Sequence, residues 1–231
     1  GRSGRVIALE IDRHVLPALQ SVVGASDNCR IILGDALKAD LAGLTAGWPG
    51  PFKVVANLPY YITTPLMVKL LCELPQCRLL VLMVQKEAVD RILARPGSKQ
   101  YGPLAILTAC FGEARREFVV PAAAFYPVPG TDSCIIRINS DQQLQIADWT
   151  AFHGFLENCF AQRRKTLVNN WIAGWRLSRE EAEGRLAPLA LPRTARPEEL
   201  TLPQWIRLAQ EHDWRREGGP APEGRSAERE R

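Results

Sequence analysis

The chain has 231 residues, of which 46% are hydrophobic and 23% charged, and its formal net charge is +4. This composition is that of an ordinary globular protein and excludes a largely disordered chain. The apolar runs fall far short of the ~20 residues that span a bilayer, and no export signal opens the chain, so we expect a cytoplasmic protein. The whole positive excess lies within residues 1–140, which permits nucleic-acid binding without requiring it.

Short β-branched runs alternate with helical patterns through the first part of the chain. The expected strands cover residues 5–11, 29–33, 52–57 and 78–85, and the expected helices cover residues 14–24, 64–74 and 86–94, with a loop after the second strand. Such alternation is typical of βαβ units and a parallel sheet. Two later strands, 114–121 and 132–139, flank a proline-rich loop and predict an antiparallel hairpin at the sheet edge.

Beyond about residue 140 the strand signal stops and amphipathic helical segments follow. They cover residues 148–162, 165–175, 178–186 and 198–212, the last opening on the helix-start signal RPEEL. We therefore predict an α/β domain over residues 1–140 and a small all-helical domain over residues 141–214. The tail, residues 215–231, is rich in Gly, Pro and charge and is expected to be disordered.

Cysteine and histidine spacing gives no sign of a metal site. None of the six cysteines forms a C-x-x-C pair, and the three histidines are scattered. Zinc sites and disulfide frameworks need more regular spacing, so we predict buried free thiols and no metal.

Polar residues close three of the expected strands: Glu10, Asp35 and Asn57. Ligands of open α/β sheets bind outside the carboxyl ends of the strands, and the spacings predict that all three project from one rim. Glu10 could accept hydrogen bonds from ribose hydroxyls and Asp35 from an adenine amino group, with the Ala36 N–H donating to a ring nitrogen. The alternative is that such acids cap the following helices or face water.

The stretch NLPYYITTP, residues 57–65, predicts a site for an adenine base. The exocyclic amine of adenine is a poor nucleophile, so an enzyme that alkylates it must hold it in line with the electrophile. The Asn57 side-chain oxygen and a backbone carbonyl, of Leu58 or Pro59, could accept its two hydrogens. Tyr60 supplies a ring for stacking.

This stretch, together with LMVQKEAVDRILARPGSKQYGPLAIL (82–107), FYPVPGTDS (125–133) and CFAQRRKTLVNN (159–170), is similar to the KsgA-type (RsmA) small-subunit rRNA adenine N6,N6-dimethyltransferases. The resemblance extends to about residue 212. It implies a Rossmann-like, S-adenosylmethionine-dependent methyltransferase sheet with a small all-helical C-terminal domain. It also implies dimethylation of two adjacent adenosines in the 3′-terminal hairpin of 16S rRNA during ribosome biogenesis, by a monomer acting on the immature small subunit.

The resemblance also implies roles for individual residues. Catalytic contacts to the target base fall to Asn57, Leu58, Pro59 and Tyr60, and stacking falls to Tyr60 and Phe125. Contacts to S-adenosylmethionine fall to Glu10, Ile11, Asp35, Ala36 and Asn57. From their charge, and not from the resemblance, we expect RNA contacts from Lys86, Lys99, Arg163, Arg164 and Lys165. The last three are successive cations in the cluster QRRKT, whose alternative role is a solvated helix face.

The chain departs from the family at its front and in one loop. Family members carry a strand and a glycine-rich loop ahead of VIALEID, whereas GRSGR is too short for them, so we predict a shortened chain with weak or no cofactor binding. A basic residue usual near Gly130 is missing as well. One alternative is a non-catalytic RNA-binding assembly factor.

Two other classes of methylase are alternatives to this interpretation. The first is a large-subunit rRNA adenine methylase that confers antibiotic resistance, against which Leu58 and the 159–170 block argue. The second is a DNA adenine methylase. It is disfavoured because such enzymes usually carry an acidic residue or a second proline in the comparable motif and lack the helical block.

Overall fold

The computed structural model describes residues 4–23, 26–140 and 146–211. His212 and the predicted tail, residues 215–231, lie outside this range. The chain divides into two compact units, Gly1–Gly50 and Pro51–Arg231, which are described separately. The domain boundary predicted near residue 140 falls inside the second unit and stays a prediction.

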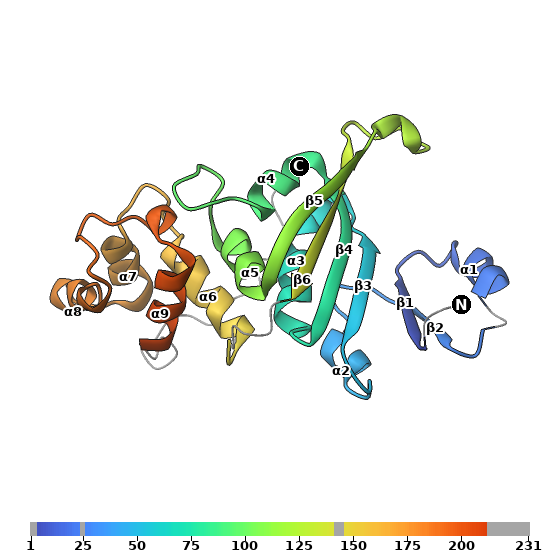
Figure 1. The fold of residues 1–231 in the computed structure, drawn as a ribbon, viewed down its shortest axis with the longest axis horizontal. Coiled ribbons are helices and arrows are strands. Elements are labelled where there is room, and N and C mark those ends of the chain that lie inside the picture. The colour runs from blue at the N-terminus through green and yellow to red at the C-terminus, as the bar shows by residue number, and fades with distance from the viewer. Residues whose placement is uncertain (1–3, 24–25, 141–145, 212–231) are drawn as a thin grey trace. The chain divides into compact units, whose positions relative to one another are not determined.

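The first unit is built on a pair of parallel strands. Strand β1 (Val6–Glu10) pairs with β2 (Cys29–Leu33) in register from Val6 opposite Cys29 to Glu10 opposite Leu33, and α1 (Leu16–Val23) connects them (Figure 1). The segment after β2, predicted as a loop, contains the short helix α2 (Leu41–Thr45). Asp40 begins this helix by accepting a hydrogen bond from the Gly43 N–H. The helix has only five residues, which are too few to show a helical period in the sequence.

The second unit contains a four-stranded sheet. Its strands are ordered β3 (Phe52–Asn57), β4 (Cys77–Gln85), β6 (Ser133–Ser140) and β5 (Gly112–Val120). The β3–β4 pair is parallel, while β4–β6 and β6–β5 are antiparallel, which confirms the predicted edge hairpin. Within the described residues, the first unit thus contains a two-stranded sheet and the second unit a four-stranded sheet, and a single sheet across both units stays a prediction.

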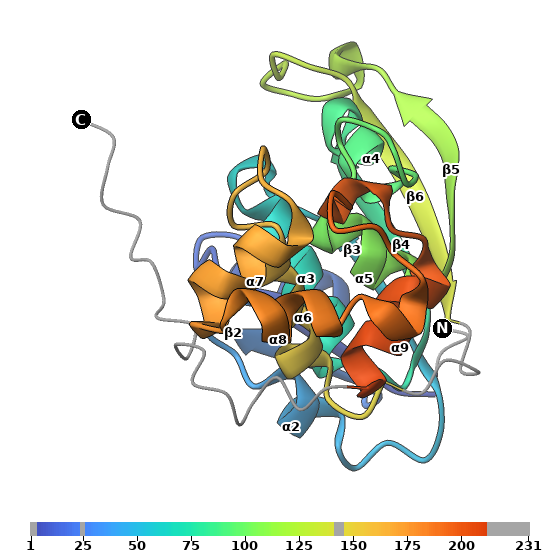
Figure 2. The same ribbon diagram turned by 90° about the vertical axis from the view of Figure 1, so that its left-hand side faces the viewer.

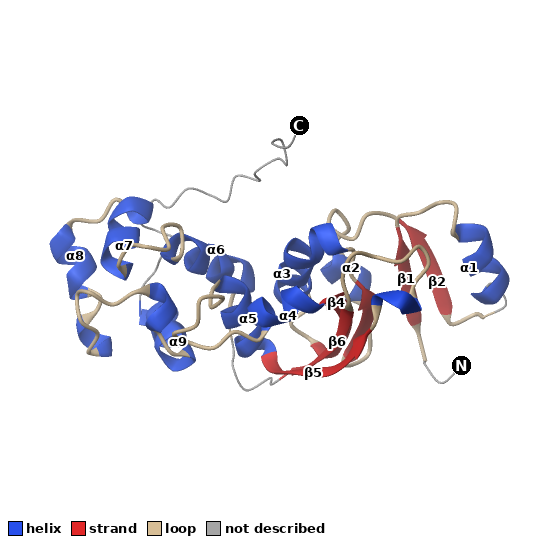
Figure 3. Ribbon diagram, turned by 90° about the horizontal axis from the view of Figure 1, so that it is seen from above, coloured by secondary structure: helices blue, strands red, loops and turns tan. Residues whose placement is uncertain are grey.

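Three helices cover one face of the four-stranded sheet. Helices α3 (Thr63–Glu73), α4 (Lys86–Ile92) and α5 (Pro103–Phe111) lie on this face, and alternate residues of β4, Leu80, Leu82 and Val84, are fully buried (Figure 3). Helix α5 was not predicted. Its sequence PLAILTACF is apolar on nearly every side, and six of its nine residues are buried, so it lacks an amphipathic period.

The remaining helices surround a second group of buried aromatic rings. They are α6 (Trp149–Cys159), α7 (Leu167–Trp175), α8 (Arg179–Gly184) and α9 (Leu202–Glu211) (Figure 2). Trp171 and Trp205 are fully buried, and the rings of Phe155 and Trp205 lie 6.0 Å apart. Asp148, Thr166 and Ser178 cap α6, α7 and α8 with side-chain oxygens, as a helix start requires.

The helix predicted at residues 198–212 begins later than expected. RPEEL forms a separate 3-10 turn over Pro197–Glu199, in which the Glu199 carboxylate accepts from the Arg196 N–H. Helix α9 then begins at Leu202, after Thr201 donates its N–H to the Gln204 side chain. The single helix predicted at residues 198–212 therefore corresponds to two elements of the structure, the 3-10 turn and helix α9.

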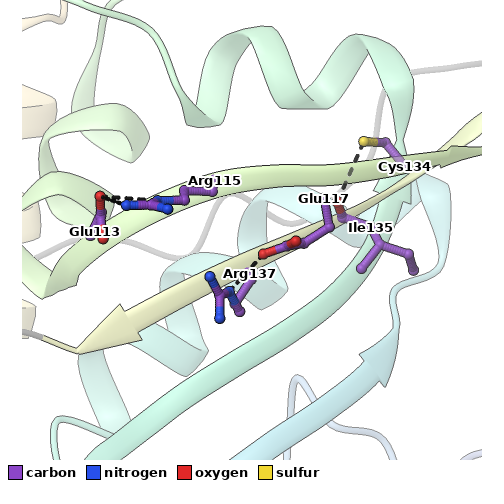
Figure 4. Close-up of polar contacts among 6 residues, drawn as sticks. All are labelled: Glu113, Arg115, Glu117, Cys134, Ile135 and Arg137. Atoms are coloured by element: carbon purple, nitrogen blue, oxygen red, sulfur yellow. Dashed lines mark hydrogen bonds and ion pairs between the residues drawn. The ribbon is translucent and has the colours of Figure 1, made fainter.

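The β5–β6 hairpin carries paired charges on its exposed side. Arg115 lies opposite Arg137, an arrangement that would be repulsive without compensation. Glu113 pairs with Arg115, and Glu117, at an irregularity in the register of β5, pairs with Arg137 at 2.6 Å (Figure 4). On β6, the Cys134 thiol also donates to the Ile135 carbonyl.

All six cysteines are free thiols, and four of them, Cys77, Cys110, Cys134 and Cys159, are buried. Burial raises the pKa of the Cys110 thiol to about 12. The part of the chain that the structure describes holds no group of three or more His, Cys, Asp or Glu side chains arranged for a metal ion. Nor does any helix in that part have the length and apolar character needed to cross a bilayer.

Candidate functional site

The stretch NLPY begins where β3 ends. Asn57 is the last residue of this strand and its side chain is exposed, whereas the Leu58 side chain is buried beneath the site. The Leu58 N–H donates to the Met83 carbonyl of β4 at 3.0 Å, so the parallel pairing of β3 and β4 fixes the backbone at this point. The amide of Asn57 is therefore presented to solvent from a rigid strand end.

The two candidate carbonyls of this stretch differ in their partners. The Pro59 carbonyl accepts hydrogen bonds from the Ile62 N–H at 3.1 Å and from the Thr63 hydroxyl at 3.2 Å, because it begins the turn that leads into α3. Among the described residues, no group donates to the Leu58 carbonyl. The choice that the sequence left open therefore favours Leu58 as an acceptor for a ligand.

Tyr60 is held by a residue far away in the sequence. Its phenol oxygen lies 2.7 Å from the hydroxyl oxygen of Ser133, which is fully buried at the first position of β6. The ring of Tyr60 is half-buried, while the neighbouring Tyr61 is 83% exposed. The hydrogen bond to Ser133 restricts how the Tyr60 ring can turn, which suits a surface on which a base stacks.

The loop between β5 and β6 carries Phe125 and is anchored at its base. The Asp132 carboxylate accepts from the Ala122 N–H at 3.0 Å, and the Asp132 carbonyl accepts from the Lys86 N–H at 3.0 Å. Phe125 is half-buried, and the Tyr126 side chain that follows it is 99% exposed. Together with the Tyr60–Ser133 bond, these contacts join the loop to the segment that holds the site.

Thr131 ties this loop to the first turn of α4. Its hydroxyl donates to the Glu87 carboxylate at 2.8 Å. The pKa of Glu87 is lowered, first by the hydrogen bond from its own backbone N–H and next by the hydroxyl of Thr131. Lys86, predicted to bind RNA, is exposed immediately before Glu87 and so lies beside this loop.

In the first unit, Glu10 and Asp35 lie at the same end of the parallel pair. Glu10 is opposite Leu33, and its carbonyl accepts from the Gly34 N–H at 2.8 Å, one residue before Asp35. Ile11, beside Glu10, is 62% exposed, and Ala36 is half-buried. The structure therefore brings together the cofactor residues predicted on these two strands. The rim predicted to be shared with Asn57 spans both units and stays a prediction.

Both carboxylates also accept local hydrogen bonds, but these lie in turns ahead of the helices that the alternative interpretation expects them to cap. Glu10 accepts from the Asp12 N–H at 2.8 Å, and Asp35 accepts from the Leu37 N–H at 2.9 Å. Each contact uses one carboxylate oxygen. The local turn thus fixes the orientation of each side chain, and the carboxylate keeps capacity to accept hydrogen bonds from a ligand.

The predicted RNA-binding cations are exposed on the connection between α6 and α7. Arg163, Arg164 and Lys165 all lie there, and the Arg163 guanidinium donates to the Lys99 carbonyl. Lys99 belongs to the segment between α4 and α5, so this contact brings two of the predicted residues together. No contact within the described residues joins Lys86 to this group.

Asn170, on the first turns of α7, holds the cation loop, residues 162–166, in place. Its buried side chain accepts from the Gln162 N–H at 2.9 Å and donates to the Gln162 and Thr166 carbonyls, each at 3.3 Å. Sequence reasoning did not single out Asn170, Ser133 or Asp132. The sequence signal that could have found them is a polar residue among apolar neighbours. Such a residue is expected to be buried, and a buried polar side chain needs a hydrogen-bond partner.

Two solved structures share the fold of this chain. A dimethyladenosine transferase from Plasmodium falciparum matches with a TM-score of 0.73 at 23% identity, covering 90% of this chain and 81% of that one. The 23S rRNA methyltransferase ErmE matches with a TM-score of 0.58 at 24% identity over the same shares. Both likenesses support an α/β methyltransferase fold with a helical C-terminal part.

Sequence comparison is more specific. Proteins named ribosomal RNA small subunit methyltransferase A match this chain in Geobacillus thermodenitrificans, at 39% identity over 90% of this chain and 74% of the relative, and in Moorella thermoacetica, at 42% over 73% and 62%. The family model described as ribosomal RNA adenine dimethylase matches residues 2–182. The resemblance of the four sequence blocks is thereby confirmed, and the chain belongs to the ribosomal RNA adenine dimethylase family.

Proposed function

We propose that this chain transfers methyl groups from S-adenosylmethionine to the 6-amino groups of two adjacent adenosines in the 3′-terminal hairpin of small-subunit (16S) rRNA. Its partner is the immature small ribosomal subunit, on which it acts as a monomer in the cytoplasm. The proposal is supported by family membership and by relatives named for methylation of small-subunit rRNA. The observation that carries it is the exposed Asn57 amide beside the free Leu58 carbonyl and the anchored Tyr60 ring.

The target adenine is proposed to bind at the end of β3. The Asn57 side-chain oxygen and the Leu58 carbonyl accept the two hydrogens of its amino group, while Pro59 keeps the backbone in the required conformation. Tyr60 stacks on one face of the base and Phe125 lies beside it. Reactive bases of RNA are typically splayed out of loops and stacked in this manner.

These contacts address the main chemical difficulty of the reaction. The lone pair of the adenine amine is delocalised into the ring, and two fixed acceptors hold the amine in an orientation that favours attack. With S-adenosylmethionine bound, the new C–N bond would form as the bond between the methyl carbon and the sulfonium sulfur breaks, which would leave the neutral thioether. The nitrogen would then be cationic and would release a proton readily to solvent. No side chain of high pKa is needed as a general base.

The proposed cofactor site lies at the carboxyl ends of β1 and β2. Bound S-adenosylmethionine would supply an electrophilic methyl group on its sulfonium. Glu10 has a carboxylate oxygen available for ribose hydroxyls and Asp35 has one for the adenine amino group, so the residues fit this group. The exposed Ile11 side chain and the Ala36 N–H would complete the adenosine contacts within the first unit, and the family resemblance adds Asn57 as a cofactor contact.

RNA is proposed to follow the exposed cations of the second unit. Phosphates are contacted by three cations of the helical domain, residues 141–214, namely Arg163, Arg164 and Lys165, and by Lys99 in the loop before α5. Lys86 contacts a phosphate beside the 121–132 loop. Such contacts position a nucleic acid without reading its sequence. Specificity then depends on which adenosine reaches Asn57.

The variant Asn57→Ala tests the target-base site. It removes an acceptor of the reacting amine and no phosphate contact, so methylation of the hairpin RNA should be abolished while RNA affinity stays within about twofold. Asn139→Ala is the matched control, since Asn139 lies near the other end of the same sheet, opposite Leu79. Loss of RNA binding in Asn57→Ala would count against the assignment.

Calorimetric titration with S-adenosylmethionine separates the enzyme from an RNA-binding assembly factor. Saturable binding, weakened by Glu10→Gln and by Asp35→Asn, supports methyl transfer. Absence of binding together with normal affinity for the hairpin RNA supports the assembly factor. A large-subunit methylase would instead modify a 23S rRNA fragment in preference to the 16S hairpin.

A further inference from the structure

A cavity of about 350 Å³ lies within the second unit. Residues of α3, α4, α5 and α6 line it, together with the loop before α5. Helices α3, α5 and α6 lie side by side (Figures 1 and 3). None of the residues assigned to the target base, Asn57–Tyr60 and Phe125, lines it. The cavity is therefore distinct from the candidate target-base site, and it shares Arg163 with the predicted RNA-binding cations.

Two arginines give the lining of the cavity a positive charge. Arg91 and Arg163 both line it, and among the described residues neither forms an ion pair with a carboxylate. The contact of Arg163 with the Lys99 carbonyl fixes the guanidinium without neutralising it, and it brings Lys99 close to the rim. Glu157 is the single acid in the lining, so the local balance favours an anionic group at the rim.

The wall of the cavity offers both an aromatic ring and polar groups. Phe160 is half-buried in it, with its ring 6.4 Å from the ring of Tyr101 and 5.5 Å from that of Trp205. His153 and Glu157 lie nearby, with the imidazole Nε2 3.7 Å from the carboxylate, and Gln100 adds an amide. Burial lowers the pKa of His153, which favours the neutral imidazole with one donor and one acceptor nitrogen.

The volume and lining match a nucleotide better than an isolated phosphate. Sites for small organic ligands begin at about 300 Å³ and combine apolar walls with a few polar groups. A phosphate alone would contact the arginines but neither the half-buried ring of Phe160 nor the exposed amide of Gln100, both of which line the cavity. Single-stranded RNA supplies both a negative phosphate and a base that can leave its stack.

We propose that this cavity binds one unpaired nucleotide of the rRNA other than the methylated adenosines, with its phosphate on Arg91 and Arg163 and its base against Phe160. The inference rests on the proposed function and assigns a second contact point on the same RNA. A second anchored nucleotide fixes the direction in which the strand runs past Asn57. The cation loop then serves as one wall of a binding site as well as a positively charged surface.

The test combines variants of the cavity with base deletions in the RNA. Arg91→Gln removes a rim charge, and Gln100→Trp fills the mouth from an exposed loop position without altering the core. Hairpin RNAs carrying an abasic site at each unpaired position in turn are titrated by fluorescence anisotropy against wild type and both variants. Arg78→Gln, at an exposed arginine outside the cavity, is the matched control.

One abasic position outside the methylated pair should weaken binding to the wild type and to Arg78→Gln by about five- to tenfold. The same deletion should have little effect in Gln100→Trp, whose cavity no longer admits the base, and Arg91→Gln should reduce the salt slope by about one. If no abasic position couples to Gln100→Trp while hairpin methylation proceeds normally, the inference is wrong and the proposed function stands. Saturable binding of adenosine monophosphate to the cavity in the absence of RNA, at micromolar concentration, would assign it to a free nucleotide and also overturn the inference.

Discussion

The phenol oxygen of Tyr60 and the hydroxyl oxygen of Ser133 lie 2.7 Å apart, although the two residues are 73 positions apart in the sequence. Ser133 is buried where β6 begins, and Tyr60 lies directly after the Asn57–Pro59 segment. This contact connects the segment that carries Tyr60 with the strand that follows the Phe125 loop, and both aromatic residues are proposed to contact the target base. The position of the Tyr60 ring therefore depends on β6 as well as on its own turn.

We expect Tyr60→Phe to keep the stacking surface but to release it from Ser133. The buried hydroxyl of Ser133 would lose a partner, which costs about 1–2 kcal/mol of unfolding free energy, and methyl transfer should fall severalfold with RNA affinity unchanged. Ser133→Ala should have a similar effect on methyl transfer. Single-turnover rates and urea denaturation measure both quantities.

The double variant Tyr60→Phe with Ser133→Ala provides the control. If the two groups act through their mutual hydrogen bond, the double variant should be no slower than the slower single variant. Additive reductions in rate would show that each residue acts separately. Tyr60→Ala, which also removes the ring, should lose a further ~1–3 kcal/mol of base stacking, to the order of magnitude seen for single-stranded binders.

Asn170 gives a second prediction, about the order of the cation loop. Replacing it with Ala removes three hydrogen bonds to the 162–166 backbone and leaves the Gln162 N–H without its partner. We expect a decrease of about 1–3 kcal/mol in unfolding free energy and a severalfold weaker affinity for RNA, with the salt slope unchanged because every cation remains. Thermal melts and anisotropy titrations check these expectations.

The neighbouring residue offers a matched control for this change. Asn169→Ala deletes the same amide one position earlier, where the side chain is only half-buried. If Asn170→Ala lowers stability but binds RNA as tightly as Asn169→Ala does, then the loop does not need Asn170 for its RNA contacts.

Most of the predicted strands and helices follow from local patterns of apolar residues and turn signals in the sequence. The runs at 29–33 and 52–57 match β2 and β3 to the residue, because β-branched residues between turn signals leave little ambiguity. Helix α5 escaped prediction because burial on nearly all sides erases the helical period. The start of α9 was wrong because RPEEL satisfies the rules of a helix cap while closing only a 3-10 turn.

The residues of the candidate site also divide into those that local sequence predicts and those that depend on contacts formed on folding. Asn57, Glu10 and Asp35 could be proposed because Asn57 and Glu10 end strands and Asp35 follows one closely, and strand ends follow from local sequence. Ser133 and Asn170 could not be assigned, because their roles arise from contacts with Tyr60 and with the cation loop that form only when the chain folds. Likewise, the choice between Leu58 and Pro59 needed the hydrogen bonds of the turn into α3.

A third prediction concerns the sequence-independent part of RNA binding. Replacing both Arg163 and Arg164 with Ala should weaken affinity for the hairpin RNA and reduce the slope of log affinity against log salt by roughly one unit for each phosphate that the variant no longer neutralises. Anisotropy titrations over a range of KCl concentrations give the slope. Arg193→Ala is the control, since Arg193 is exposed and pairs with Glu183 at 3.2 Å. An unchanged slope in the double variant would make these arginines a solvated surface.

The last prediction uses the protonation of His153. Burial lowers the pKa of this imidazole below its ordinary value of 6.5, and the nearby Glu157 carboxylate raises it by a smaller amount. The unfolded chain therefore takes up the proton at a higher pH than the folded chain does. It follows that the stability contributed by neutral His153 is present above about pH 6.5 and is lost as the pH falls through the lower folded pKa.

His153→Gln, which cannot titrate, should lose less unfolding free energy than the wild type between about pH 7.5 and pH 5, as measured by urea denaturation. Glu157→Gln removes the opposing charge and should make the decrease steeper than in the wild type. Equal decreases in the wild type and His153→Gln would mean that the imidazole has the same proton affinity in both states, and burial would then not control its charge.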